Sequence, residues 1–122
     1  MPSTDEHLRQ AKQNEGFVDS FDLKSSPYLD WALTGIFYSA VHYIEAVLAI
    51  NGKHPIVHSQ RNTWICMYIN NSDIYDAHRD LKDDSRDARY KCITVSEIKV
   101  NESKMKLEDI KKDLKTFLPQ IV

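Results

Sequence analysis

The run from Trp31 to Leu48 constrains the fold of this chain more than any other segment. It is apolar almost throughout, and it holds one histidine, His42, and one carboxylate, Glu45. A helix that is apolar nearly all round must be buried on most of its sides. We therefore expect the other elements of the chain to be helices arranged around this one.

A membrane span is the alternative interpretation of the same region, because Leu33 to Ile50 approaches the minimal length of such a span. His42 and Glu45 lie inside the segment and Asp30 precedes it, and ionisable groups are costly in lipid. The flanking segments are amphipathic and compatible with water. We therefore predict a core helix and no contact with a membrane.

Composition indicates a globular protein. With 122 residues, of which 42% are hydrophobic and 28% charged, the chain is expected to form a single domain over residues 1–122. A net charge of -2 excludes a generic binder of double-stranded nucleic acid, so any such contact must be local. The polar start, Met1 to Gln13, lacks a secretory signal pattern and favours a cytoplasmic location. Cys66 and Cys92 are expected to be free thiols.

Start and stop signals divide the first half of the chain into two helices. Ser3 and Glu6 have capping-box spacing and open a helix expected from Thr4 to Leu23. The pair Ser26-Pro27 suits the beginning of the second helix. That helix is expected to end at Gly52, since glycine readily takes the left-handed conformation that terminates helices.

Three more helices are expected in the second half. Ser59 can cap a third helix that runs to about Asn70, and a fourth extends from about Ser72 to Cys92. Residues at spacings of three and four predict the inner face of the fourth helix: Ile74, His78, Leu81, Ser85, Ala88 and Cys92.

The last helix is expected to open at a second capping-box pair, Thr94 and Glu97, and to run to about Leu118 before Pro119. Its expected inner residues are Ile98, Met105, Leu107, Ile110, Leu114 and Phe117. Because the connections are short, the prediction is an all-α antiparallel bundle of four to five helices.

Small residues also follow one side of the second helix. They are Ala32, Gly35, Ser39 and Ala46. They permit close approach by another helix, with one from the same chain as the default and one from a dimer partner as the alternative.

The second helix resembles the signature helix of the HEPN domain family (higher eukaryotes and prokaryotes nucleotide-binding). The resemblance rests on Phe37-Tyr38-Ser39-Ala40-Val41-His42, on the connection Gly52-x-His54-Pro55-x-x-His58, and on Tyr75 upstream of Ser85-Arg86-Asp87-Ala88-Arg89-Tyr90. It covers roughly Leu29 to Tyr90. The order and spacing of these motifs within an all-α chain of this length carry the assignment.

The resemblance implies a bundle of four or five helices that dimerises, so a homodimer is expected. Many members of the family are ribonucleases, often paired with a small nucleotidyltransferase in toxin-antitoxin or phage-defence systems. Their nuclease signature is an arginine followed, after four to six residues, by a histidine. In the dimer, histidine handles the proton of the 2'-hydroxyl and arginine the phosphate charge.

This chain departs from the nuclease signature. Arg61 and Arg86 are the best candidates for its arginine, but neither has a histidine at the required spacing. The positions concerned hold Cys66, Met67 and Tyr68 after Arg61, and Lys91, Cys92 and Ile93 after Arg86. We therefore expect a non-catalytic module that binds RNA, a nucleotide or a protein partner. A divergent metal-independent ribonuclease is the alternative.

Cationic residues recur along the expected fourth helix. Arg79, Lys82, Arg86 and Arg89 share one stripe, beside a parallel stripe of Asp76, Asp80, Asp83 and Asp87. Exposed ion pairs between the stripes would be weak and purely structural. Arg86 and Arg89 lie next to Tyr90, a possible stacking surface, so these three and Arg61 are the predicted phosphate or nucleotide contacts.

The histidines have several interpretations. His42 is expected to be a core histidine that is hydrogen-bonded to a hydroxyl or carbonyl, and His78 lines the inner face of the fourth helix. Both are the candidate acid-base groups if the chain is catalytic. His54 and His58 form a weaker predicted polar patch with Arg61 at the start of the third helix. The spacing matches no zinc pattern, so neither a metal nor a cofactor is expected.

Overall fold

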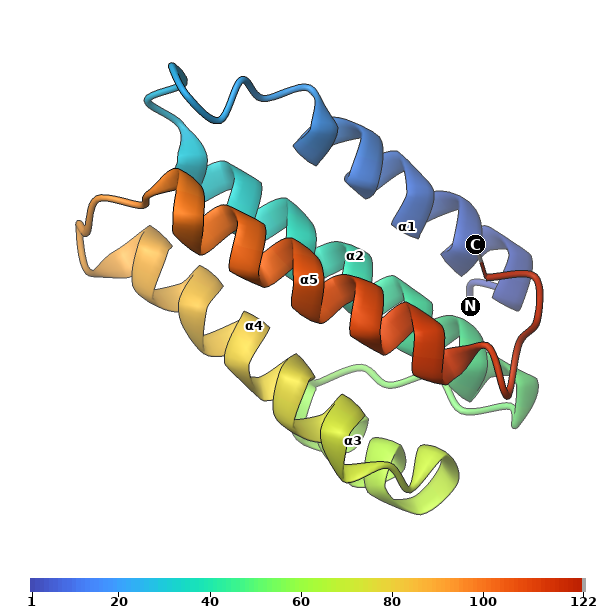
Figure 1. Cartoon of the computed structure of the whole chain (residues 1–122). Helices are drawn as coiled ribbons and strands as arrows, with labels where there is room; N and C mark the ends of the chain where they lie inside the picture. The colour runs from blue at the N-terminus through green and yellow to red at the C-terminus, as the bar shows by residue number, and fades with distance from the viewer. Residues whose placement is uncertain (122) are drawn as a thin grey trace.

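The chain forms an all-α bundle, as its periodicity predicts. The computed structural model describes residues 1–121 and contains five α-helices and one short π-helix. In chain order they are α1 (Thr4–Asp19), α2 (Leu29–Ile50), α3 (His58–Trp64), the π-helix η1 (Ile65–Ile69), α4 (Ser72–Tyr90) and α5 (Glu97–Leu114). Figure 1 shows the long helices side by side, with both ends of the chain at one end of the bundle.

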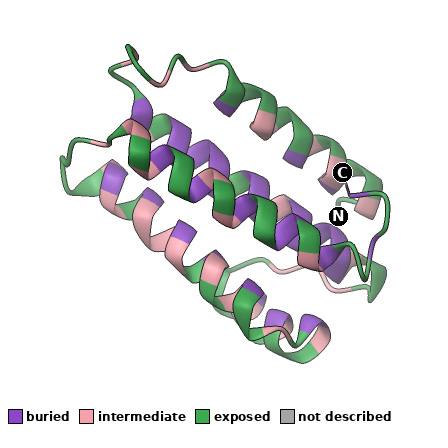
Figure 2. Cartoon of the chain, in the orientation of Figure 1, coloured by how far each residue is buried: buried purple, intermediate pink, exposed green. Residues whose placement is uncertain are grey.

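Helix α2 is the centre of the bundle. It packs against α1, α4 and α5, and Figure 2 shows that it carries much of the buried surface. Among the helices of residues 1–121 it alone has the length and hydropathy of a membrane span, and 72% of its most apolar window is buried inside the protein. Burial on most sides is what an apolar helix at the centre of a bundle requires.

The beginning of α1 follows the sequence prediction and its end does not. Ser3 accepts a hydrogen bond from the backbone N–H of Glu6, and the Glu6 carboxylate accepts one from the N–H of Ser3, which completes the expected capping box. The helix ends at Asp19 rather than Leu23. The Ser20 hydroxyl donates to the carbonyl of Phe17 and so occupies a carbonyl of the last turn.

Helix α2 begins later than expected and ends where expected. The Ser26 hydroxyl accepts from the N–H of Tyr28, so Ser26 closes a turn before the helix and does not cap it. At the other end, Gly52 has φ +68° and its N–H donates to the carbonyl of Ala49. The predicted left-handed glycine is confirmed.

Helices α3 and α5 have different caps from those predicted. Val57, not Ser59, precedes α3, and Ser96, not Thr94, caps α5 by accepting from the N–H of Lys99. For α5, Thr94 and Ser96 have the same capping chemistry, so sequence spacing alone selected the wrong one. For α3, the N-cap residue Val57 makes no side-chain hydrogen bond, so no capping signal marks the start of the helix.

The inner face of α5 is also a correction. The helix ends at Leu114, not Leu118, so Phe117 lies beyond it, and Ile98, Met105 and Phe117 are exposed rather than buried. The buried residues recur at spacings of three and four: Val100, Ser103, Leu107, Ile110, Lys111 and Leu114. Ile98 and Met105 are seven residues apart and lie on the other side of the helix.

The expected third helix is divided. After α3 the backbone widens into η1, where the N–H of Asn70 donates to the carbonyl of Ile65, and Asn70 ends it with φ 51°. Helix α4 shows the predicted inner face except at Cys92, which lies beyond the end of the helix at Tyr90 and is exposed. Cys66 and Cys92 are free thiols, as predicted.

Helices α1 and α2 approach closely at Gly35. A Cβ atom at this position would lie 2.7 Å from Cγ2 of Val18 on α1. For Gly35, therefore, the neighbour is a helix of the same chain, which was the default expectation for the small residues of α2.

Candidate functional site

Four of the five histidines of the chain are connected, directly or through neighbouring side chains of α2 and α3. Contacts between side chains join α1, α2 and α3 in the order His42, His7, Glu45, Arg61 and His58. We call these five residues the histidine cluster. They come from segments far apart in the sequence, so the cluster exists only in the folded chain.

Two histidines and a carboxylate meet at the centre of the cluster. Nδ1 of His7 on α1 lies 3.0 Å from Nδ1 of His42 on α2 and 3.6 Å from Oε2 of Glu45. His7 is 5% exposed and Glu45 8% exposed. His42 was expected to bond a hydroxyl or carbonyl, and its partner is instead another imidazole.

Arg61 lies on the opposite side of Glu45. Its Nε and Nη2 atoms donate to Oε1 of Glu45 at 3.1 and 2.9 Å, and its Nη1 lies 2.7 Å from Nδ1 of His58. The predicted meeting of His58 and Arg61 therefore occurs. However, Arg61 is 8% exposed and its guanidinium is held by an acid, so it has little freedom to contact a phosphate.

The cluster favours neutral imidazoles. Burial lowers the pKa of His7, and the carboxylate of Glu45 opposes this effect. Burial also lowers the pKa of His42; the carboxylate of Glu45 opposes this effect and the charge of Arg61 adds to it. Since an unperturbed histidine has a pKa near 6.5, both rings are predominantly neutral at pH 7. A neutral imidazole offers a lone pair on one of its nitrogens.

His58 lies beside cationic groups of two helices. Partial burial lowers its pKa, followed by the charges of Arg61 on α3 and of Lys82 on α4, and Arg89 acts in the same direction. Its ring also lies 6.2 Å from that of Phe37 on α2. We call His58, Lys82 and Arg89 the cationic edge. Its positive charges are those of Lys82 and Arg89, because the lowered pKa keeps His58 neutral at pH 7.

Lys82 and Arg89 differ from the other cations of α4. Neither makes an ion pair with a carboxylate within residues 1–121. Nη1 of Arg89 lies 3.3 Å from the Ser85 hydroxyl, and its guanidinium carbon lies 5.5 Å from the ring centre of Tyr90, which is 74% exposed. The charges of the cationic edge are therefore available to an anion.

Arg79 and Arg86 behave as the structural interpretation of the charge stripes predicts. Arg79 pairs with Asp76 and Asp80, and Arg86 pairs with Asp83 at 3.3 Å. These side chains are exposed, so each pair contributes little to stability. The predicted phosphate contact of Arg86 competes with its aspartate, whereas that of Arg89 does not.

The remaining two histidines lie at the edge of the cluster. His78 on α4 is 1% exposed and stacks on Phe37 with ring centres 5.7 Å apart. Burial lowers its pKa to about 3, and it cannot reach a bound RNA. His54, in the connection after α2, has a buried Nδ1 without a hydrogen-bond partner in residues 1–121.

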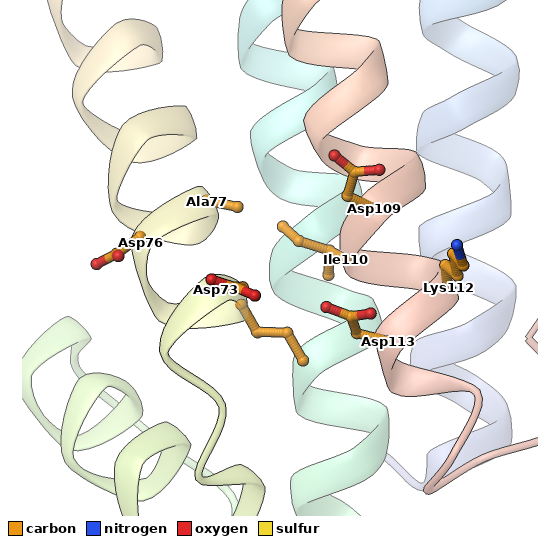
Figure 3. Close-up of a pocket in the computed structure, with 8 residues that line it drawn as sticks. Asp73, Asp76, Ala77, Asp109, Ile110, Lys112 and Asp113 are labelled. Carbon is orange, nitrogen blue, oxygen red and sulfur yellow. The ribbon is translucent and has the colours of Figure 1, made fainter.

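An open groove between α4 and α5 has a different character. It has a volume of about 360 Å³ and is lined by Asp73, Asp76, Asp109 and Asp113 among others. Figure 3 shows Asp73 and Asp113 directed toward the gap from opposite helices, while Asp76 points away. Its negative charge disfavours phosphates, and it contains no residue of the histidine cluster.

Sequence reasoning missed His7. It lies four residues before Ala11 and eleven before Val18, both buried on the inner side of α1, so helical phase could have placed it inward. Its partners could not have been found in this way. His42 and Glu45 are more than thirty residues away along the chain, and only packing of α1 on α2 brings them together.

No family model, curated protein or solved structure matches this chain. The candidate site must therefore be interpreted from its own chemistry. The HEPN resemblance stays a prediction.

Proposed function

We propose that this chain is a non-catalytic HEPN-like module that binds single-stranded RNA along the cationic edge. The observation that carries the proposal is that Lys82 and Arg89 have no carboxylate partner within residues 1–121, while Tyr90 beside them is exposed. Cations free to contact phosphates, next to an aromatic surface for bases, are the two components of single-strand binding.

Each residue has a distinct role in this proposal. Lys82 and Arg89 lie seven residues apart on α4 and so face the same way, spaced to contact the backbone of one strand. Tyr90 offers a ring on which a base can stack, and Arg89 lies against that ring. The net charge of -2 is compatible with this function because the contact is local.

The protonation of His58 supports binding more than catalysis. Arg61 Nη1 can only donate, so Nδ1 of His58 accepts and the proton of the neutral ring is on Nε2. In this tautomer, which is assigned from the hydrogen bond, Nε2 can donate to a phosphate oxygen. It cannot accept the proton of a 2'-hydroxyl while the contact with Arg61 persists.

Filter binding to a labelled single-stranded RNA tests the proposal. The double variant Lys82→Ala/Arg89→Ala should lose binding, and the slope of log affinity against log salt should become shallower by about 1.4, or about 0.7 for each phosphate contact removed. Tyr90→Ala should weaken binding by about 1–3 kcal/mol through lost stacking.

Arg79→Ala is the matched control, because it removes a cation of the same helix that is already paired with Asp76 and Asp80. It should bind RNA as the unmodified protein does. Equal losses in the control and in the double variant would indicate a general charge effect and contradict the assigned site. RNA binding that is unchanged in the double variant would also reject it.

The Arg61–His58 contact favours a second candidate function, a metal-independent ribonuclease. The pair has the residue types of the family's nuclease signature, although histidine precedes arginine by three residues here. If the chain is such an enzyme, it should cleave RNA in the presence of a chelator and leave 2',3'-cyclic ends, and His58→Ala should abolish cleavage. Under the leading proposal no cleavage occurs.

The family resemblance extends the proposal to partners. A homodimer and a nucleotidyltransferase partner from a toxin-antitoxin or defence system are the expected assemblies. Co-purification of a tagged form from its native cell, followed by identification of bound protein and RNA, tests both expectations in one experiment.

A further inference from the structure

Three ligand atoms converge on one point between α1 and α2. His7, His42 and Glu45 each offer one ligand atom, a ring nitrogen or a carboxylate oxygen, and these three atoms lie within 4.8 Å of one another. Two of the separations are 3.0 and 3.6 Å. None of these atoms is needed for the RNA contact proposed above.

Hydrogen bonding alone does not satisfy this arrangement. The 3.0 Å contact between Nδ1 of His7 and Nδ1 of His42 can be a hydrogen bond only if one of the two nitrogens carries a hydrogen and the other accepts it. The third atom, Oε2 of Glu45, lies 3.6 Å from Nδ1 of His7, which is too far for a hydrogen bond. A cation placed between the three atoms would accept a lone pair from each of them.

The separations match a tetrahedral zinc site. With Zn–N and Zn–O bonds of about 2.0–2.1 Å, two ligand atoms of a tetrahedron lie about 3.3–3.4 Å apart. The observed 3.0 and 3.6 Å bracket this value. Two histidines and one glutamate are also an established zinc ligand set, one that leaves a fourth position open.

The surroundings hold the ligands in place. Arg61 binds Oε1 of Glu45 with two nitrogens and so directs the other oxygen toward the histidines, as outer-shell groups do around metals. Nδ1 of His54, in the connection after α2, is buried without a hydrogen-bond partner in residues 1–121. The positive charge of Arg61 opposes a second cation and will limit the affinity.

We infer that His7, His42 and Glu45 form a binding site for a divalent zinc ion, with Nδ1, Nδ1 and Oε2 as the ligand atoms. The ion would join α1 to α2 at the end of the bundle where both chain termini lie. Sequence spacing could not reveal the site because its ligands come from two helices that are separated by a long connection.

Zinc titration of the chelator-treated protein, followed by calorimetry, tests the inference. One ion per chain should bind, and zinc should raise the melting temperature. Cobalt should give the absorption spectrum of a four-coordinate ion. His42→Asn and Glu45→Gln should each lose stoichiometric binding and the zinc-dependent shift in melting temperature.

His58→Asn is the matched control, because it removes a histidine of the same cluster that is not among the three ligands. It should retain zinc, although it is expected to weaken RNA binding, so the two proposals can fail separately. Circular dichroism at low temperature checks that each variant is folded. Absence of zinc binding in the unmodified protein, or its persistence in folded His42→Asn and Glu45→Gln, would overturn the inference.

Discussion

His78 shows how one residue can oppose the stability of the fold that buries it. Both ring nitrogens are buried without a hydrogen-bond partner in residues 1–121, and the ring lies against Phe37. An unsatisfied buried polar atom costs roughly 1–3 kcal/mol. Stacking on Phe37 recovers about 0.5–1.5 kcal/mol of that cost.

We predict that His78→Leu stabilises the protein. Leucine has a similar volume and no polar atom, so the free energy of unfolding at neutral pH should rise by about 1 kcal/mol. Urea denaturation followed by circular dichroism measures the change. A lower stability would show that a bound water or another group satisfies the ring in solution.

The same variant should flatten the pH dependence of stability. In the unfolded chain His78 takes up a proton below its ordinary pKa near 6.5, whereas in the folded chain its pKa is about 3. Wild-type stability therefore falls as the pH drops from about 6.5 toward 3. Between pH 7 and pH 5, the free energy of unfolding should fall by roughly 2 kcal/mol less in His78→Leu than in the wild type.

At the scale of elements, the contact between α1 and α2 depends on the absence of a side chain. Gly35 lies in the N-terminal part of α2, and an added Cβ would meet Cγ2 of Val18 at 2.7 Å. Val18 is buried and β-branched, so it cannot easily move away. Gly16, near the end of α1, has nothing within 4 Å of its Cβ position.

These two glycines form a matched pair of predictions. Gly16→Ala should stabilise the protein by about 0.5–1 kcal/mol, because alanine favours the helix and fills open space. Gly35→Ala should destabilise it by about 1–2 kcal/mol, because overpacking outweighs the same gain in helix propensity. Thermal or urea denaturation of the two variants measures both signs.

Higher stability in both variants would mean that α1 can shift away from α2 without cost. Lower stability in both would mean that α1 has a special conformation at Gly16. Opposite signs would support the observed helix contact.

At the scale of the whole molecule, α2 is incompletely covered. One edge of it exposes Trp31 and Tyr38, and Tyr28 just before it is also exposed. Large exposed aromatic side chains near one another are typical of interaction surfaces. The family resemblance implies a dimer, and this edge is the surface on the central helix where a partner could pack.

We predict that the protein elutes as a dimer in size-exclusion chromatography with light scattering, and that Trp31→Asp converts it to a monomer. A charge at this position should cost the dimer several kcal/mol, because it would be buried without a partner. The variant should retain its helical circular dichroism, since Trp31 is half exposed in the single chain. A dimer that persists in Trp31→Asp would place the interface elsewhere, and a monomeric wild type would reject the homodimer.

Much of the architecture could be predicted because its causes are local. The capping box at Ser3, the glycine at Gly52 and the inner face of α4 all depend on residues within a few positions of one another. Errors arose where two local signals were equivalent. Thr94 and Ser96 are both good caps, and Ser96 is the one that accepts from the N–H of Lys99.

The sequence by itself determined that α2 is a buried central helix and that the chain is an all-α bundle, because hydrophobic periodicity acts along each helix separately. Only the tertiary structure decided the site. It placed His7 against His42 and Glu45, directed Arg61 onto that carboxylate, and left Lys82 and Arg89 without an acid in residues 1–121. The physical reason is that such contacts depend on how the helices pack against one another. The spacing of residues within one helix does not determine that packing.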